Sequence, residues 1–184
     1  KEFFFTTSFY NKLLDTKSPS RFLFYPNPYL LSPLLNHKDS LIKISNEDVR
    51  NFRINILKKK EKRSMHNFLW LNLVDRKNEF KIIQKIIDEW ITKYKKYKKD
   101  VWSDNLISIR IISWISNADL ILDNNQRHFN KTFYKSLMRQ ITFVKKNIQN
   151  ISDENRKISS ISAIILSGLV FKEYYSNYKL GLKE

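Results

Sequence analysis

The stretch from Val101 to Leu122, VWSDNLISIRIISWISNADLIL, is the feature that most constrains the fold of this chain. Near its start lies Ser103-Asp104-Asn105, whose side-chain oxygens can cap the start of a helix. Apolar residues then recur at helical spacing and also fill much of the opposite side. A helix that is apolar nearly all round has to be covered on several faces. We therefore expect a single buried helix here, around which the rest of the chain packs.

Arg110 is the one charged residue in the middle of this apolar stretch. A guanidinium held among apolar side chains needs an anionic or a multiply hydrogen-bonded partner, because an uncompensated buried charge is costly. The partner can come from the protein, in which case Arg110 ties helices together. It can also come from a ligand, in which case Arg110 contacts a bound anion.

The chain is strongly basic, with 34 Lys and Arg against 18 Asp and Glu and a formal net charge of +16. Hydrophobic residues (42%) and aromatic residues (14%) are too many for a disordered chain, so the 184 residues should fold around a sizeable core. The charge favours a polyanionic partner, whether nucleic acid, anionic polysaccharide or acidic lipid. The abundance of Lys, Asn and Ile offers another explanation, in which codon bias produces part of the charge.

The sequence shows no pattern typical of a metal site, a membrane-spanning segment or a signal peptide. It has no cysteine, and its three scattered histidines, His37, His66 and His128, do not form a metal-ligand pattern, so we expect neither a metal nor another cofactor. No charge-free apolar run of about 18 residues is present that would span a membrane. The chain starts at Lys1 without the features of a signal peptide, which suggests a segment or a processed product and leaves the compartment unknown.

Residues 1–65 differ in kind from the rest of the chain. Their first ten residues are rich in aromatic side chains, which we expect to pack on the helical body, and a short helix is expected near Phe9–Leu14. They also contain all four prolines of the chain, which favour extended or turning backbone. Alternating residues at 41–44 and 52–56 predict two short strands or extended arms. The basic run at 58–63 is interpreted as a solvated face. We expect an irregular lead-in, 1–65, packed on a helical domain, 66–184.

From His66 onward the chain has no proline, and its periodicity is helical. It predicts a short apolar helix at 66–74, an amphipathic helix of four or five turns at 80–94, a third long helix beginning near Asn130, and a fourth capped by Ser152-Asp153. The stripe of the fourth helix consists of Ile158, Ile161, Ile165 and Leu169. Loops of roughly six to twelve residues are typical of antiparallel hairpins packed side by side. Gly168, inside the last helix, costs about 1 kcal/mol relative to Ala, so we expect a close helix crossing there.

An ordered series of short motifs runs through this helical region. The motifs are FLWLNLVDRK (68–77), IIDEWI (86–91), VW (101–102), RIISWIS (110–116), Gln140 before an apolar turn, ISAIILSGLVF (161–171) and Gly181-Leu182. In this order they resemble the N-terminal helical domain of the heparinase II/III-like family of polysaccharide lyases. The resemblance covers roughly Asn67 to Leu182 and implies a mainly all-α fold, with antiparallel hairpins that form part of an incomplete α/α toroid. Family members continue into a large antiparallel β-sandwich, and this chain is too short to contain one.

The family cleaves uronic-acid-containing polysaccharides by β-elimination. Removal of the C5 proton requires hydrogen bonds that neutralise the adjacent carboxylate, so that the developing anion is stabilised. The resemblance assigns this role to Asn155, at the start of the last long helix, and places Arg156 where the family often has a histidine. Arg156 can hold a carboxylate but cannot serve as a base. Because the family's catalytic Tyr and remaining His lie beyond residue 184, we expect this chain to be inactive alone.

Four further residues are candidates for substrate binding, and each also has a structural interpretation. Arg110 and Gln140 can contact a sugar or cross-link helices. Trp102 and His66 lie near helix ends, where the cleft of a toroid opens, and an aromatic ring there can stack on a sugar or pack in the core. Asn155 also has a second use, because an amide at a helix start can bond its own backbone.

The favoured hypothesis is the N-terminal portion of such a lyase, binding an acidic polysaccharide together with the absent β-sandwich of the same protein. The alternative is a non-catalytic module that binds an anionic glycan or assists surface-polysaccharide assembly, and Arg156 in place of histidine favours it slightly. An all-α nucleic-acid-binding protein is a third hypothesis. Charge and aromatic content support it, but no helix-turn-helix spacing or RNA-binding signature does. A periplasmic location is suggested by the family resemblance alone.

Overall fold

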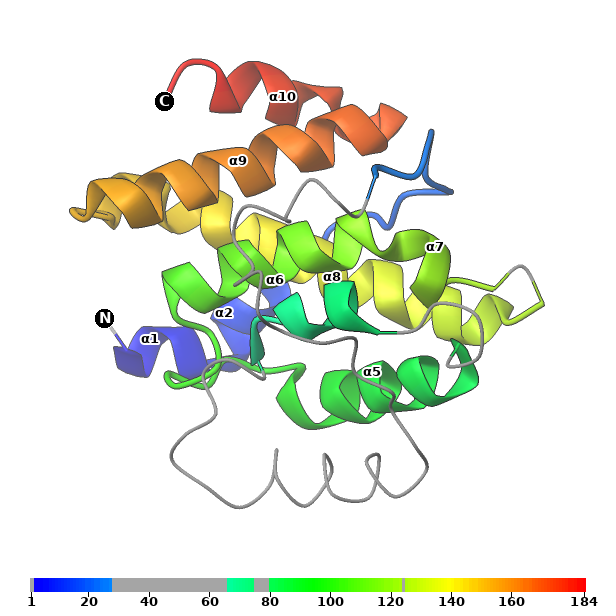
Figure 1. Cartoon of the computed structure of the whole chain (residues 1–184). Helices are drawn as coiled ribbons and strands as arrows, with labels where there is room; N and C mark the ends of the chain where they lie inside the picture. Colours follow the sequence, from blue (N-terminus) through cyan, green and yellow to red (C-terminus); the bar gives the residue numbers. More distant parts are fainter. Residues whose placement is uncertain (1, 28–65, 75–79, 124) are drawn as a thin grey trace.

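The computed structural model describes residues 2–27, 66–74, 80–123 and 125–184 (Figure 1). Within these ranges all regular secondary structure is helical, and about eight helices form a mainly helical domain. The prediction of a mainly all-α protein is therefore confirmed. The predicted strands at 41–44 and 52–56, the basic run at 58–63 and His37 lie outside the described residues.

Four long helices make up the body of the domain: α5 (Phe80–Tyr94), α6 (Asp104–Ser116), α8 (Arg127–Asn147) and α9 (Glu154–Val170). The shorter elements are α1 (Glu2–Thr6), α2 (Ser8–Leu13), η2 (Leu69–Leu73), α7 (Ala118–Ile121), η3 (Ile148–Asn150), η4 (Lys172–Tyr174) and α10 (Tyr175–Gly181). The helices predicted near Phe9–Leu14, at 80–94, near Asn130 and after Asp153 are confirmed. The short apolar helix predicted within 66–74 is a 3-10 helix, η2.

Helix α5 buries the apolar stripe that its sequence predicts. The stripe begins at Phe80, which is half-buried. It continues through six residues that are each at most 5% exposed: Ile83, Ile86, Ile87, Trp90, Ile91 and Tyr94. Two hydrogen bonds set α5 antiparallel to the following helix. Gln84, near the start of α5, donates to the Ile121 carbonyl at 2.8 Å, and Trp102 donates to the Tyr94 carbonyl at 2.9 Å. The first hairpin of the predicted body is therefore present.

Helix α6 is the buried element expected from the Val101–Leu122 stretch, but it ends before the stretch does. The backbone leaves the helical conformation at Asn117 (φ −110°, ψ 22°), and the short helix α7 begins at Ala118. The Asn117 side-chain amide donates back to the Ser113 carbonyl at 2.9 Å and to Asn72 Oδ1 at 3.2 Å. Asparagine competes with the helix in this way through local side-chain hydrogen bonds. The single helix predicted here is thus corrected to two, and Asn117 makes the break.

Side-chain contacts along α6 fix the directions of its two long neighbours. Trp114 lies 5.2 Å from Phe133 and Trp102 lies 5.5 Å from Phe143, measured between ring centroids, so α8 runs antiparallel to α6. The hydroxyl oxygens of Ser108 and Ser160 lie 2.9 Å apart, near the starts of α6 and α9. Helix α9 therefore runs parallel to α6, with both starts at the same end (Figure 1). Helices α5 and α8 therefore run antiparallel to α6 and α9 runs parallel to it, and no toroid arrangement is shown among the described helices.

The buried face of α9 differs from the predicted stripe. Ile158 is 61% exposed and Leu169 is 39% exposed. The face that packs inward is made mostly of small residues: Ser160, Ala163, Ile164, Ser167 and Gly168. Ser160 meets Ser108 of α6, whereas Ser167 and Gly168 meet Asn177 and Tyr178 of α10. Small side chains therefore let α9 approach both of these helices closely. The prediction of Ile158 and Leu169 as core residues is therefore wrong.

The close crossing expected at Gly168 is confirmed. A Cβ atom added to Gly168 would lie 2.2 Å from the backbone nitrogen of Tyr178, so α10 crosses α9 with almost no space between the two backbones. At the other end of α10, a Cβ atom on Gly181 would lie 2.4 Å from Cγ1 of Ile165. The two glycines of the chain thus hold α10 against α9.

Part of the aromatic N-terminus packs on the body, as predicted. Tyr10 is 3% exposed, and the ring of Phe5 lies 5.6 Å from Phe143 of α8. Beyond α2 the chain is irregular, and the Leu23 amide donates to the Val170 carbonyl at 2.9 Å. The expectation does not hold for every aromatic residue, because Phe3 and Phe9 are 86% and 64% exposed.

Candidate functional site

Arg110 lies at the centre of a buried polar cluster between α5, α6 and α8. Its side chain has no exposed surface. The Nε atom donates to Oε1 of Gln140, and Nη1 donates to the carbonyls of His66 at 2.8 Å and Val101 at 3.1 Å. The guanidinium carbon also lies 4.4 Å from the ring centroid of Trp90, a cation–π contact. Arg110 therefore has the multiply hydrogen-bonded partner set that its position requires, and the protein supplies it.

Burial lowers the pKa of Arg110 to about 9, which leaves the side chain charged at neutral pH. Among the described residues no carboxylate bonds to it, and neutral carbonyl oxygens, one amide and an aromatic face compensate the charge. Within the described residues Nη2 has no hydrogen-bond partner. A buried guanidinium held by several acceptors and a ring is a strong constraint on how the three helices pack.

His66 and Trp102 belong to the same cluster. Nδ1 of His66 accepts a hydrogen bond from Nε1 of Trp90 at 3.0 Å, and Nε1 of Trp102 donates to the Tyr94 carbonyl. Burial lowers the pKa of His66 to about 4, and the positive charge of Arg110 contributes to the shift. His66 is therefore neutral at pH 7. It is 7% exposed and Trp102 is 2% exposed, so the inward faces of both rings are already occupied by protein.

The structure thus brings together four of the six residues that the sequence named as site candidates: Arg110, Gln140, His66 and Trp102. Hydrogen bonds join Arg110 directly to Gln140 and to the backbone of His66 and Val101, which precedes Trp102. The geometry gives this cluster a role in joining helices. Sugar binding by these four residues stays a prediction, and their burial does not favour it.

The other two candidates, Asn155 and Arg156, lie on the surface in the first turn of α9. The helix is capped by Asp153, whose Oδ1 accepts from the Arg156 amide at 2.9 Å. Arg156 is 52% exposed and forms long ion pairs with Asp104 and Asp153, both at 3.8 Å. The exposed Asn155 side chain makes no hydrogen bond to any described residue, since Asp153 performs the capping. The alternative use of Asn155, bonding its own backbone, is therefore not seen.

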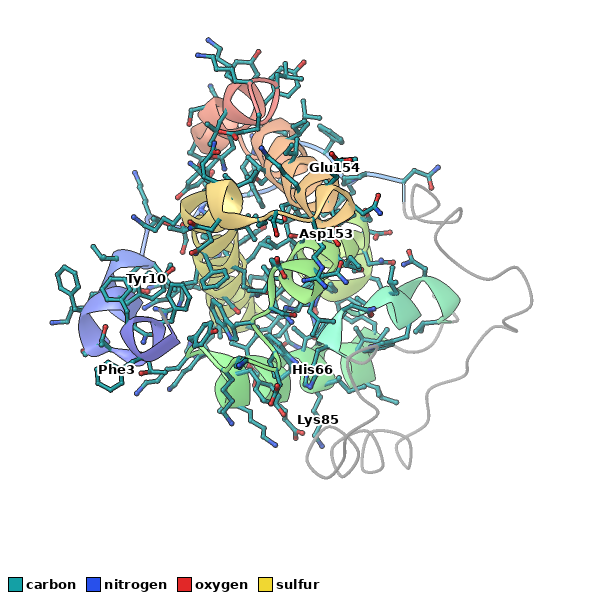
Figure 2. All side chains as sticks on the ribbon, turned by 90° about the vertical axis from the view of Figure 1, so that its left-hand side faces the viewer. Phe3, Tyr10, His66, Lys85, Asp153 and Glu154 are labelled. Atoms are coloured by element: carbon teal, nitrogen blue, oxygen red, sulfur yellow. The ribbon has the colours of Figure 1, made fainter. Side chains whose placement is uncertain are left out.

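The starts of α6 and α9 meet around Arg156, because the two helices run parallel. We call Asp104, Asp153, Glu154, Asn155 and Arg156 the α6/α9 end. Figure 2 shows Asp153 and Glu154 in the upper half of the view and His66 in the lower half, so this surface is separate from the buried cluster. Asp104 and Asp153 lie near Arg156, and Glu154 adds a third carboxylate to this set of residues. The surface therefore offers directional donors, the Asn155 amide and the guanidinium, and not an excess of positive charge.

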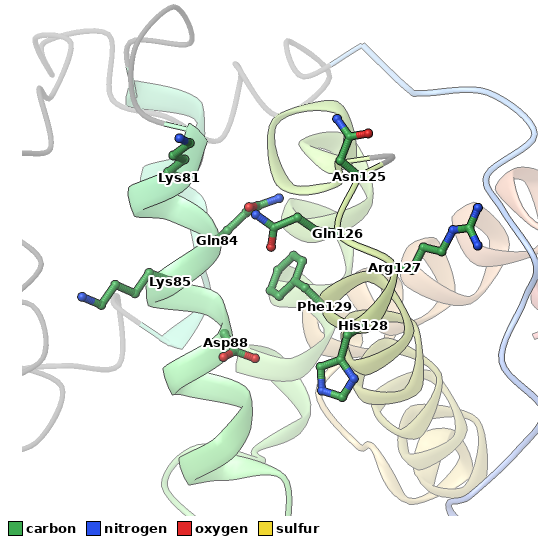
Figure 3. Close-up of a pocket in the computed structure, with 9 residues that line it drawn as sticks. All are labelled: Lys81, Gln84, Lys85, Asp88, Asn125, Gln126, Arg127, His128 and Phe129. Carbon is green, nitrogen blue, oxygen red and sulfur yellow. The ribbon is translucent and has the colours of Figure 1, made fainter.

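A cavity of about 920 Å³ opens between the start of α5 and the start of α8, and none of the six candidates lines it (Figure 3). Gln84 and Gln126 face each other across it, and Phe129 lies below them (Figure 3). A second cavity, of about 350 Å³, lies between α2, the end of α5 and α8, and Trp102 is the one candidate that lines it. No motif in the sequence linked the residues of either cavity, because they come from segments far apart in the chain.

Neither a metal nor a membrane-spanning site is indicated in the described part of the chain. No group of three or more His, Cys, Asp or Glu side chains there is arranged to hold a metal ion. None of the described helices is both long and apolar enough to cross a membrane.

Comparison of the chain with protein-family models, with curated proteins and with solved structures found no match in any of the three. The resemblance to the lyase family therefore rests on the sequence motifs alone.

Proposed function

We propose that the chain is the helical, polysaccharide-binding portion of a heparinase II/III-like lyase, and that Asn155 contacts a uronate carboxylate at the α6/α9 end. The observation that carries the proposal is that the Asn155 side chain makes no hydrogen bond to any described residue. It is exposed, and Asp153 rather than Asn155 caps the helix. An amide that has no structural task at a helix start can donate a hydrogen bond to a carboxylate, with help from the helix dipole.

The packing directions support a toroid fragment as the underlying fold. Helices α6 and α9 run parallel, and α5 and α8 each run antiparallel to α6. Alternation of this kind, with one helix of each hairpin in each layer, is what two neighbouring hairpins of an α/α toroid require. In such a fold the starts of α6 and α9 would lie at one rim of the cleft.

Local charge sets how an acidic glycan would bind here. The carboxylates of Asp104, Asp153 and Glu154 outnumber the one cation, Arg156, so local charge at this end disfavours an anionic glycan. Binding then depends on the directional hydrogen bond from Asn155 and on the overall charge of +16, which raises the local concentration of polyanions. The chain alone binds without cleaving, because Arg156 cannot act as a base.

A non-catalytic glycan-binding module is the second candidate function. Arg156, at the position where the family often has a histidine, is the observation that favours it. Ultraviolet absorbance of unsaturated uronate products separates the two functions. Absorbance that grows with the chain alone, and is lost in Asn155→Ala, would show that the chain contains its own acid and base and would contradict the inactivity expected here.

Calorimetric titration with a uronate oligosaccharide tests the binding proposal, with a neutral glucan oligosaccharide and a DNA duplex as comparison ligands. Loss of a hydrogen bond to a charged group costs about 1.5–3 kcal/mol, so Asn155→Ala should weaken uronate binding by about tenfold or more. The control is Asn125→Ala, another exposed asparagine at the start of α8. Equal affinity of both variants would contradict the proposal, and binding confined to DNA with a steep salt dependence would favour the nucleic-acid hypothesis.

A further inference from the structure

The smaller of the two cavities combines positive charge with an apolar floor. Its volume of about 350 Å³ lies within the range of small-molecule sites. Four exposed lysines surround it, Lys12 from α2, Lys95 and Lys96 after α5, and Lys135 from α8. We call this the lysine pocket. It is formed by different residues from those of the α6/α9 end.

Charge in the lysine pocket is poorly compensated by the protein. Asp15 is the one carboxylate among the described lining residues, against four lysines and Arg139. Its Oδ1 is already bonded to Nη1 of Arg139 and lies 4.0 Å from Nζ of Lys135. Four ammonium groups from three segments around one small cavity repel each other, and a bound anion would relieve that repulsion.

Arg139 provides a second, independent indication of an anionic ligand. Its Nη1 donates to Asp15 and its Nη2 donates to Asn11 Oδ1 at 2.9 Å, which fixes the guanidinium in the wall of the pocket. The Nε atom is buried and has no hydrogen-bond partner among the described residues. A buried charged donor without an acceptor is costly, so Arg139 adds incompletely compensated positive charge to the wall of the pocket, and an anion bound nearby would offset it.

The floor of the pocket is apolar, which favours a ligand with an apolar group over an inorganic ion. Trp102 and Ile91 line it, and each has only a small exposed fraction, 2% and 4%, which faces the cavity side of the core. The small exposed parts of these two side chains make one side of the pocket apolar, which favours a ligand that carries an apolar group beside its anionic group.

We propose that the lysine pocket binds a small organic anion, a phosphate or carboxylate group attached to an apolar ring. The anionic group lies between the exposed ammonium groups of Lys96 and Lys135, and the apolar group lies on the apolar side of the pocket. The binding is independent of the polysaccharide proposal, because Asn155 and Arg156 take no part in it.

Calorimetric titration of the whole chain with phenyl phosphate, at constant ionic strength, tests the proposal. Inorganic phosphate and benzyl alcohol are the two comparison ligands, and phenyl phosphate should bind more tightly than either. The double variant Lys96→Gln/Lys135→Gln removes two exposed charges and should weaken binding by about tenfold. The matched control is Lys131→Gln/Lys146→Gln, which removes two exposed lysines of α8 that do not line the pocket.

Each outcome decides the question. Tenfold loss in the pocket variant, with little change in the control and in Asn155→Ala, supports the lysine pocket. Equal loss in both lysine variants would show attraction by diffuse charge and overturn it. Absence of measurable binding of phenyl phosphate, or equal affinity for inorganic phosphate, would also overturn it. Uronate binding that persists in the pocket variant keeps the two sites distinguishable.

Discussion

Arg110 of α6 and Gln140 of α8 are joined by a hydrogen bond from Nε to Oε1, and neither side chain has any exposed surface. The bond links two antiparallel helices at the centre of the domain. Because Arg110 also bonds the carbonyls of His66 and Val101, one side chain connects α6 to α8 and to the segments before η2 and α6. Polar groups buried this deeply are costly when one partner is removed.

Gln140→Leu should lower the free energy of unfolding by roughly 3 kcal/mol, because it leaves the Nε donor of a buried guanidinium without its acceptor. Urea denaturation measures the change. The matched control is Gln126→Leu at the exposed start of α8, for which we expect a change within about 0.5 kcal/mol. Similar losses in both variants would contradict the central place of the Arg110–Gln140 bond.

The double variant Arg110→Met/Gln140→Leu should be more stable than Gln140→Leu alone. Both polar partners are then replaced by apolar groups of similar size, and the unpaired charge is gone. The same urea denaturation, analysed as a double-mutant cycle, gives the coupling between the two residues. Additive losses would show that the two side chains act independently.

Gly168→Ala should destabilise the protein although alanine favours helices. Helix propensity alone predicts a gain of about 1 kcal/mol at this position. The added Cβ would lie 2.2 Å from the backbone nitrogen of Tyr178, so α10 has to move away from α9, and we expect a net loss of about 2 kcal/mol or more. Thermal and urea denaturation give the sign. The control is Ser176→Ala on the exposed side of α10, and a stabilised Gly168→Ala would show that the crossing is looser than described.

Stability should fall between pH 6.5 and pH 4 as His66 becomes protonated in the unfolded chain. Its pKa is lowered from 6.5 to about 4 in the folded protein, chiefly by burial. Because the unfolded state binds the proton first, the contribution of neutral His66 is complete above pH 6.5 and is lost as the pH approaches 4. The slope from this one group is at most about 1.4 kcal/mol per pH unit.

Urea denaturation at several pH values measures this slope, and His66→Phe should reduce it. The variant removes the titrating group while keeping a ring beside Trp90 and Tyr94. An unchanged slope in the variant would contradict the assignment to His66.

Helical periodicity predicted most of the long elements, because α5 and α8 each expose one face to solvent and their stripes are visible in the sequence. It failed for α9. The apolar residues Ile158 and Leu169 are exposed, and the inward face is formed by small residues, which carry little hydrophobic signal. The break at Asn117 was also missed, since it depends on a side-chain hydrogen bond to Ser113.

The candidate site was predicted in part. The need of Arg110 for several hydrogen-bond acceptors followed from its apolar surroundings, and Gln140 was named as a possible cross-link. Their direct contact could not be predicted, because it depends on how α6 and α8 are aligned. The lysine pocket could not be predicted from the sequence for the same reason, since Lys12, Lys96 and Lys135 come together only when α2, α5 and α8 pack.

Hydrogen–deuterium exchange with a uronate oligosaccharide is the measurement that tests the central claim most directly. If Asn155 contacts a uronate carboxylate, the ligand should slow amide exchange in the first turns of α9 and α6, at residues 153–158 and 103–108. The slowing should be lost in Asn155→Ala and kept in Asn125→Ala. Protection confined to other segments, or equal protection in the Asn155→Ala variant, would contradict a polysaccharide site at the α6/α9 end.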